Sequence, residues 1–144
     1  MGRESAEGYY LDSFNYAALK ILLLDPLKKG NLRYKAKAFN YKTDKGIISP
    51  HKKASLSSIL IFDGVFTHRP ELRDYWDYSI YLDISEEESM RRGLSLISED
   101  EEKSRQLYET RYIAGQRIYV AKSDPKKYAD IVINNNDPEN PVIL

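Results

Sequence analysis

The chain of 144 residues is long enough for one compact domain and too short for two of ordinary size. It has 22 basic and 22 acidic side chains, and 42% of its residues are hydrophobic, which is typical of globular rather than disordered proteins. Because it contains no Cys, disulfides, thiolate catalysis and Cys-based zinc sites are excluded. With two histidines, a histidine-built metal site is not expected either.

No apolar run approaches the roughly 20 residues that a membrane-spanning helix needs, so no membrane partner is expected. The first four residues, Met1 to Glu4, have neither the basic and apolar regions of a signal peptide nor a complete myristoylation motif. We therefore expect a cytoplasmic domain.

Positive and negative charges are separated along the chain. Residues 1–72 carry 12 basic and 7 acidic side chains, whereas residues 73–144 carry 10 and 15. The positive excess lies within residues 28–53, where nine Lys and Arg side chains accompany Asp44 alone. Such a segment indicates an anionic partner, either a phosphate-bearing ligand or nucleic acid, or else a lysine-rich loop that faces water.

The first predicted elements are a helix and a hairpin. The helix has its N-terminal cap at Asp12-Ser13 and ends at Pro26, because proline cannot donate a helical hydrogen bond. A turn signal at residues 43–46 then predicts a small β-hairpin over about 36–48.

A strand is predicted over residues 58–62, because Ile59 to Phe62 form the continuous apolar run of a parallel strand that is buried on both faces. It ends at Asp63, at the edge of the predicted sheet where open α/β folds bind ligands. A carboxylate in this position could hold a magnesium ion, or the Asp-Gly pair could simply turn the chain.

The second half of the chain alternates helices with strands, which predicts an α/β fold with parallel pairing. Ser85, with Glu88 three residues later, has the pattern of a helix-capping box. The predicted elements are a short helix over 70–75, a strand over 78–84, a helix from Ser85 through Arg92, a longer helix over about 101–122, and a strand over 129–133.

Arg91 and Arg92 are candidate phosphate ligands, because a guanidinium group can bind two phosphate oxygens at once. The acidic run 86–88 could instead pair with both arginines at helical spacing, and spacing alone favours this second interpretation. Near the basic segment, Phe39 and Tyr41 could stack on a nucleobase or form the inner face of the hairpin.

Three glycine motifs are missing from the sequence: Gly-x-x-x-x-Gly-Lys-Ser/Thr, Gly-x-Gly-x-x-Gly and Gly-x-Ser-x-Gly. These 144 residues therefore contain no recognisable phosphate-binding loop.

Five stretches, taken together and in this order, resemble the uridine kinase family of P-loop nucleoside kinases: residues 7–14, 38–43, 59–66, 72–83 and 127–133. The resemblance implies an α/β fold, namely an incomplete P-loop-kinase-like parallel sheet with flanking helices and a small β-hairpin insertion, in a single domain over 1–144. Members of this family transfer the γ-phosphoryl group of ATP to the 5′-hydroxyl of uridine or cytidine, with Mg2+.

The resemblance also implies roles for individual residues. Asp12 would hold the ribose, Phe39 and Tyr41 would flank the pyrimidine, and Asp63 matches an acid near the magnesium ion. Arg91 and Arg92 match arginines that reach the phosphates. Arg111 matches a position near the substrate, and Asn136 and Asp137 match the loop beside the adenine.

Members of the family carry the P-loop and the catalytic Asp ahead of the stretch that matches Gly8 to Asp12. These 144 residues therefore look like the last two-thirds of the family, and we expect no phosphoryl transfer from this chain alone, because the P-loop supplies much of the positioning and charge stabilisation. ATP and Mg2+ are expected for the complete family member, with a nucleoside or nucleotide rather than nucleic acid as partner. The alternative is a non-catalytic module that binds nucleotide or nucleic acid through residues 28–53.

The resemblance also bears on assembly. In the family, the P-loop strand lies between the strands that match 58–63 and 78–84. Without that strand, each predicted strand has an unpaired apolar edge, which is a template for pairing with another chain. We therefore expect self-association through these exposed strand edges.

Overall fold

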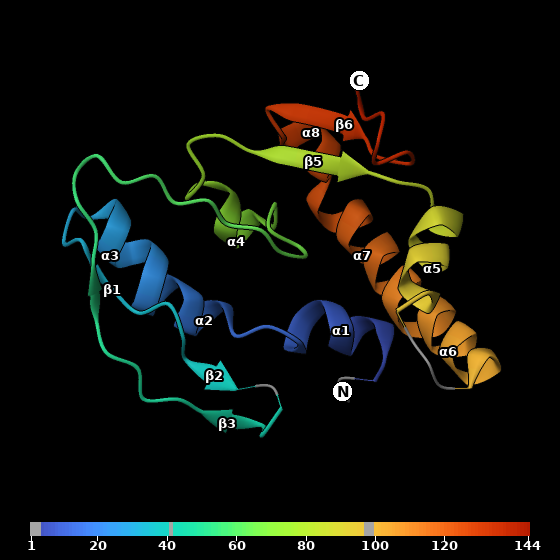
Figure 1. Ribbon diagram of the computed structural model, residues 1–144, viewed down its shortest axis with the longest axis horizontal. Helices are drawn as coiled ribbons and strands as arrows, with labels where there is room; N and C mark the ends of the chain where they lie inside the picture. Colours follow the sequence, from blue (N-terminus) through green and yellow to red (C-terminus); the bar gives the residue numbers. More distant parts are fainter. Residues whose placement is uncertain (1–3, 41, 97–99) are drawn as a thin grey trace. The chain divides into compact units, whose positions relative to one another are not determined.

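The computed structural model describes residues 4–40, 42–96 and 100–144, and the chain folds as two compact units (Figure 1). Unit 1 comprises residues 1–13 and 64–144, and unit 2 comprises residues 14–63. Among the described residues, no helix combines the length and the apolar character needed to cross a membrane.

Unit 1 contains a three-stranded sheet and several helices. Its strands are β5 (Ile80–Asp83), β6 (Ile131–Asn134) and β7 (Val142–Ile143). Its helical elements are α1 (Ala6–Asp12), α4 (Pro70–Arg73), α5 (Glu86–Leu94), α6 (Glu101–Leu107), the π-helical turn η2 (Tyr108–Ile113), α7 (Ala114–Ser123) and α8 (Pro125–Tyr128). Elements α6, η2 and α7 follow one another without a break, as the predicted helix over 101–122 requires.

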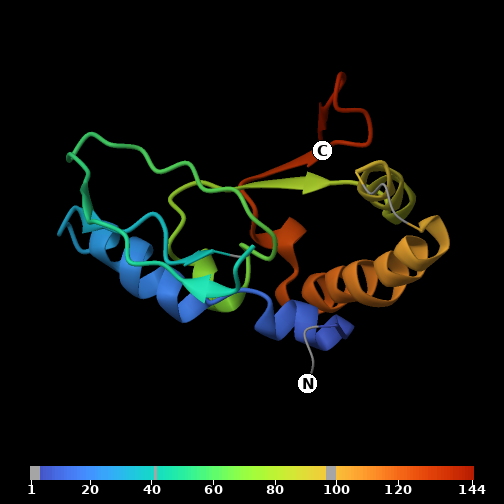
Figure 2. The same cartoon turned by 60° about the horizontal axis from the view of Figure 1, so that its bottom comes forward.

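The sheet of unit 1 has the order β5-β6-β7. Strands β5 and β6 are parallel, with Ile80 opposite Ile131 and Asp83 opposite Asn134, so the predicted strands over 78–84 and 129–133 are confirmed. Strand β7 adds an antiparallel pair that the sequence does not predict, because two residues are too few for a periodic pattern. Figure 2 shows α7 beneath the β5–β6 pair.

Aromatic side chains form the core of unit 1. Phe66 is 2% exposed, and its ring centroid lies 5.3 Å from that of Tyr10 and 5.1 Å from that of Tyr119. Tyr9 packs on Phe66 edge to face at 5.1 Å. These contacts join α1, the turn that holds Phe66, and α7, so they bring distant parts of the sequence together.

Two basic side chains are buried beside this core. The guanidinium group of Arg69 lies 4.2 Å from the ring centroid of Tyr10 and donates a hydrogen bond to the carbonyl oxygen of Tyr10. The backbone N–H of His68 donates to the hydroxyl of Tyr119 at 3.1 Å. Burial lowers the pKa of the His68 imidazole, since a charged ring would lose its hydration there.

Unit 2 consists of a helical segment and a β-ribbon. The helical segment comprises α2 (Tyr16–Leu19), the π-helical turn η1 (Lys20–Leu24) and α3 (Asp25–Lys28). The short strands pair as β1 (Arg33–Tyr34) with β4 (Lys52–Lys53) and β2 (Phe39–Asn40) with β3 (Lys45–Gly46), both antiparallel. The hairpin predicted over 36–48 is confirmed.

The predicted start of the first helix of unit 2 is wrong. Asp12 is the last residue of α1, which is capped by Ser5 and belongs to unit 1. The next helix is capped instead by Asn15, whose side-chain oxygen accepts from the backbone N–H of Ala18 at 2.9 Å.

The predicted end of that helix is also wrong, because it continues through Pro26 to Lys28. In an α-helix, Pro26 would leave the carbonyl of Leu22 without its donor. That carbonyl accepts from the backbone N–H of Lys35 at 2.8 Å, and a π-helical turn precedes the proline. The tertiary contact therefore compensates for the missing helical bond.

The strand predicted over 58–62 is also wrong: these residues form no strand. Ile59 and Ile61 are 88% and 90% exposed rather than buried on both faces. A strand exists only through hydrogen bonds to a neighbour, and no described strand pairs with this segment. The apolar run alone therefore did not determine the conformation.

Candidate functional site

The carboxyl edge of the parallel β5–β6 pair lies in unit 1 and gathers several of the candidate residues. Strand β5 ends at Asp83 and leads into α5, while β6 ends at Asn134 and leads into the loop 135–141. The backbone N–H of Asn135 donates to the carbonyl oxygen of Asp83 at 2.8 Å, which extends the ladder by one bond. Ligands of open α/β sheets bind at this kind of edge.

Arg92 of α5 ties the helix to the loop after β6. Its Nη2 donates to the carbonyl oxygens of Asn135 at 2.6 Å and Asn136 at 3.0 Å. Its Nε donates to Glu88 at 2.6 Å. The guanidinium group is thus held in one orientation from two sides, and it lies at the carboxyl edge of the sheet.

The start of α5 makes a second link to this loop. The Ser85 hydroxyl accepts from the backbone N–H of Glu88 at 3.1 Å, as the capping pattern predicts. The backbone N–H of Ser85 donates to the side-chain oxygen of Asn136 at 2.9 Å, instead of to Glu88. The Glu88 carboxylate, which would accept this bond in a complete capping box, is bound by arginines instead.

Glu88 binds both neighbouring arginines. Arg91 donates to the carboxylate through Nε at 2.7 Å and Nη2 at 2.6 Å, in addition to the Arg92 bond. These hydrogen bonds, with that from Arg91 the larger influence, lower the pKa of Glu88 to about 2. The pairing of the acidic run 86–88 with both arginines, which the sequence spacing favoured, is therefore observed at Glu88. Within the described part of the chain, Nη1 of Arg91 and Nη1 of Arg92 make no hydrogen bond.

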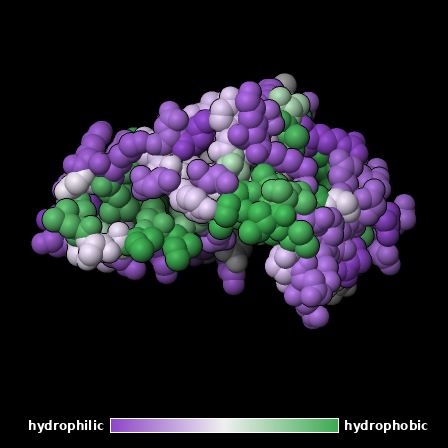
Figure 3. Space-filling view, turned by 90° about the horizontal axis from the view of Figure 1, so that it is seen from above, coloured by the Kyte–Doolittle hydropathy of each residue, from purple (hydrophilic) through white to green (hydrophobic). Residues whose placement is uncertain are grey.

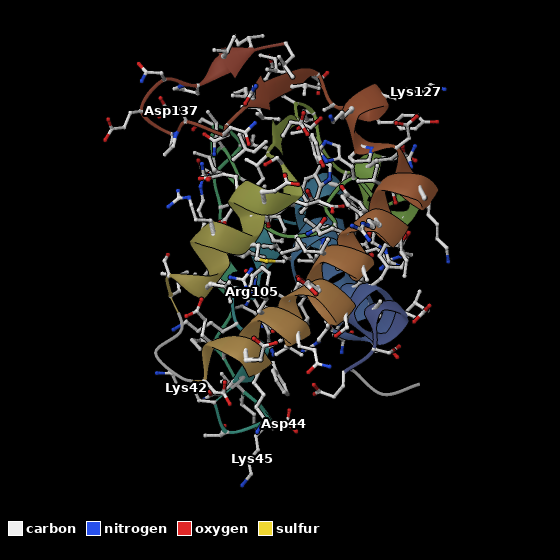
Figure 4. The ribbon with its side chains drawn as sticks, turned by 90° about the vertical axis from the view of Figure 1, so that its right-hand side faces the viewer. Lys42, Asp44, Lys45, Arg105, Lys127 and Asp137 are labelled. Carbon is white, nitrogen blue, oxygen red and sulfur yellow. The ribbon has the colours of Figure 1, made fainter. Side chains whose placement is uncertain are left out.

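The loop after β6 is organised by its own side chains. Asn136 donates through Nδ2 to the side chain of Asn134 at 2.9 Å. The carboxylate of Asp137, labelled in Figure 4, accepts from Asn140 at 2.8 Å and from the backbone of Glu139 at 3.0 Å. The Asn140 hydrogen bond is the main cause of a lowered pKa of Asp137, and the charge of Arg92 lowers it further. Arg92, Asn136 and Asp137 are thus brought together.

Sequence reasoning missed an ion pair at the same edge. Lys126 of α8 lies with its Nζ 2.7 Å from a carboxylate oxygen of Asp83. The sequence did contain a signal for Asp83, because an acid at the carboxyl end of a predicted strand is the pattern that marked Asp63 as a candidate. No comparable pattern marked Lys126.

Arg111 and Asp12 lie elsewhere in unit 1. Arg111 of η2 approaches Glu4 at 3.8 Å and the ring centroids of Tyr9 at 5.5 Å and Tyr112 at 5.0 Å. Its described contacts include neither of the arginines of α5. Asp12 is exposed at the last turn of α1, and its carboxylate makes no hydrogen bond or ion pair with another described residue.

The other candidates belong to unit 2 or lie outside the described residues. Phe39 in β2 is 51% exposed. Tyr41 lies outside the described residues. Asp63 is exposed, in a segment without regular structure, and its carboxylate makes no described hydrogen bond or ion pair. Within unit 1, the structure therefore gathers the arginines of α5 with Asn136 and Asp137.

Among the described residues, no three Asp, Glu or His side chains gather into a metal-binding cluster. Mg2+ in nucleotide-binding enzymes commonly uses only one or two carboxylates together with phosphate oxygens. A single uncommitted carboxylate such as that of Asp63 fits this requirement.

Comparison with solved structures assigns the fold. A structure described as that of a possible uridine kinase from Bacillus stearothermophilus matches with a TM-score of 0.62 and 24% sequence identity. The fold is uridine-kinase-like. The match covers 92% of this chain and 61% of that chain, so this chain spans about three-fifths of the matched protein's length. No protein-family model and no curated protein matches. The α/β class and the likeness in fold expected from the sequence are confirmed.

Proposed function

We propose that this chain is the part of a uridine-kinase-like protein that binds nucleoside and nucleotide, and that it transfers no phosphoryl group alone. The observation that supports this proposal most is the junction that Arg92 makes between α5 and the loop after β6. It lies at the ligand-binding edge of a parallel strand pair, in a chain whose fold matches that of a possible uridine kinase.

Phosphate would bind at the arginines of α5. Glu88 and the loop carbonyls already hold Arg91 and Arg92, so little side-chain entropy remains to be lost on binding. The Nη1 groups of both arginines remain available as donors. Charge-assisted hydrogen bonds of this kind are roughly twice as strong as neutral ones.

The nucleoside would bind through residues matched by the resemblance. The uncommitted carboxylate of Asp12 can accept hydrogen bonds from ribose hydroxyls, and the exposed ring of Phe39 offers a face for a pyrimidine, with Tyr41 as the second aromatic group. The loop that contains Asn136 and Asp137 would contact the adenine of ATP, and Arg111 would lie near the substrate.

We expect this chain to bind a metal ion but not to catalyse phosphoryl transfer. Asp63 would hold Mg2+ through one carboxylate, and the ion would neutralise charge on the nucleotide phosphates. Because the 144 residues contain no P-loop motif and no residue was matched to the catalytic base, binding without turnover is the expected behaviour.

Calorimetric titration of the chain with Mg-ATP tests the phosphate site. Removing the guanidinium group in Arg92→Ala should weaken the binding of Mg-ATP about tenfold or more, since a hydrogen bond to a charged group contributes about 1.5–3 kcal/mol. Arg105→Ala is the matched control, because Arg105 pairs only loosely with Glu101 at 3.6 Å on α6. Equal affinities for all three proteins would contradict the site.

A coupled kinase assay with uridine tests the second half of the proposal. We expect no turnover above background from the chain alone. Robust phosphorylation that disappears in Asp63→Ala would overturn the proposal that the chain is inactive.

Self-association remains part of the proposal. Among the described strands β5 pairs with β6 alone, and Ile80 and Leu82 on one of its faces are 51% and 55% exposed. Figure 3 shows a hydrophobic surface over this sheet. Light scattering of the purified chain tests this expectation, and a monomer at all concentrations would contradict it.

A further inference from the structure

Unit 2 has an unusual charge balance for its size. It contains ten Lys and Arg residues, three Asp and no Glu, which gives a net charge of +7. Since the chain as a whole is neutral, unit 1 carries −7. A surplus of this size within 50 residues destabilises a compact unit through self-repulsion unless anions bind to it.

Seven of the ten basic residues of unit 2 lie within residues 33–53, which hold two antiparallel strand pairs that we call the ribbon. Beyond the paired strands, the Ser49 hydroxyl donates to the carbonyl of Lys37 at 2.5 Å, and the backbone N–H of Ile47 donates to that of Ala38 at 2.8 Å. These bonds connect the β1–β4 pair to the β2–β3 pair. Residues 33–40 and 45–53 therefore run antiparallel to each other along the ribbon.

At the base of the ribbon, the strand register places like charges together. Arg33 stands directly opposite Lys53, and both side chains are exposed. Neither side chain has a carboxylate partner among the described residues. Like charges directly opposite each other destabilise a strand pair. An anion bound between them would remove this repulsion.

At the tip of the ribbon, an exposed aromatic ring lies among further lysines. Phe39 is 51% exposed and stands opposite Gly46, which has no side chain to cover the ring. Only the Ala38 carbonyl, at 3.9 Å, would contact a side chain added at Gly46, so the space above it is open. Lys42 and Lys45 flank this position, and Figure 4 shows Lys45 extending away from the ribbon.

We propose that this basic ribbon, defined by Arg33, Lys42, Lys45, Lys52, Lys53 and Phe39, binds single-stranded nucleic acid. The cations would contact successive phosphates while a base stacks on Phe39, the combination that sequence-tolerant single-strand binding requires. An acidic protein would match the charges but would leave the exposed ring without a role. This activity is additional to the binding of a nucleoside or of ATP.

Fluorescence anisotropy with a labelled uridylate oligomer of about 12 nucleotides tests the proposal on the intact chain. The logarithm of the association constant should fall linearly with the logarithm of the salt concentration, by about 0.7 for each phosphate contact. In Arg33→Gln/Lys53→Gln the slope should decrease by about 1.4, and binding at about 0.1 M salt should weaken about tenfold or more.

The matched control is Lys103→Gln/Lys127→Gln, which removes the same charge from unit 1 and should change both quantities little. Phe39→Leu should weaken binding and leave the salt slope unchanged, because the ring contacts no phosphate. A wild-type protein that does not bind at low salt, an equal loss in the control pair, or equal binding of poly-glutamate would overturn the proposal.

The proposal that the chain binds a nucleoside and the proposal that the ribbon binds single-stranded nucleic acid can be refuted independently of each other. Loss of oligomer binding in Arg33→Gln/Lys53→Gln with unchanged calorimetric affinity for uridine supports the ribbon, because an uncharged nucleoside does not compete for its cations. Circular dichroism of this variant should match the wild type. If the variant is unfolded, the salt slope of the wild type with the uridylate oligomer still decides the matter, because an uncharged nucleoside produces no such slope.

Discussion

The two units of the chain are stabilised in different ways. Unit 1 buries an aromatic core, in which the rings of Tyr10, Phe66 and Tyr119 are at most 4% exposed. In unit 2, Leu24 alone among the described residues is buried, and its strands are two residues long. Unit 1 is therefore held by packing, whereas unit 2 depends on backbone hydrogen bonds and must tolerate a net charge of +7.

The largest effect is expected for truncation of the unit 1 core. Phe66→Ala should lower the free energy of unfolding by about 3–5 kcal/mol, because it removes a fully buried ring and leaves a cavity. Chemical denaturation followed by circular dichroism measures this change. A loss below about 1 kcal/mol would show that the aromatic contacts do not hold unit 1 together.

A smaller loss is expected where α1 packs against α7. A Cβ at Gly115 would lie 2.6 Å from the ring of Tyr9 and 3.2 Å from the carbonyl oxygen of Ala6. Gly→Ala normally stabilises a helix interior, but here Gly115→Ala should destabilise by about 1–3 kcal/mol through overpacking. Thermal melting measures the effect. The cost should shrink when Tyr9 is also replaced by Ala, and stabilisation by Gly115→Ala would contradict this packing.

The buried histidine of unit 1 should make its stability depend on pH. Burial, and secondarily the charge of Arg73, lowers the pKa of His68, while Asp130 raises it and the Tyr81 ring packs at 6.2 Å. The unfolded chain therefore takes up a proton at higher pH than the folded chain. Stability should be full above the unfolded pKa of about 6.5 and should fall as the pH drops below it.

Replacing His68 tests whether its imidazole causes the pH dependence of stability. His68→Phe should remove the loss of stability that begins near pH 6.5, whereas His51→Gln, at the exposed histidine of unit 2, should preserve it. Denaturant titrations at a series of pH values measure both. Identical profiles for the two variants would assign the pH dependence to other groups.

The smallest effect is expected for the exposed apolar run of unit 2. Ile59→Ala and Ile61→Ala should each change stability by less than about 0.5 kcal/mol, because both side chains are almost fully exposed. Amide hydrogens of residues 59–62 should exchange much faster than those of β5 and β6. Slow exchange over 59–62 would show that this segment is covered in solution.

The sequence by itself determined the elements whose signals are local. The Ser85 cap of α5 and the helical stretch 101–123 follow from side-chain preferences within one or two turns, and the hairpin tip follows from its turn residues. The parallel strands at 80–83 and 131–134 were also predicted, because each follows a helix and carries an apolar pattern.

Only the tertiary structure decided the features that depend on a distant partner. Pro26 remains within a helix because Lys35 supplies the donor for Leu22. The apolar run 59–62 forms no strand, because no described neighbour pairs with it. Arg92 is tied to the loop after β6 across more than 40 residues of sequence. Periodicity and capping report on the local chain, whereas such hydrogen bonds arise only when separate segments meet in the fold.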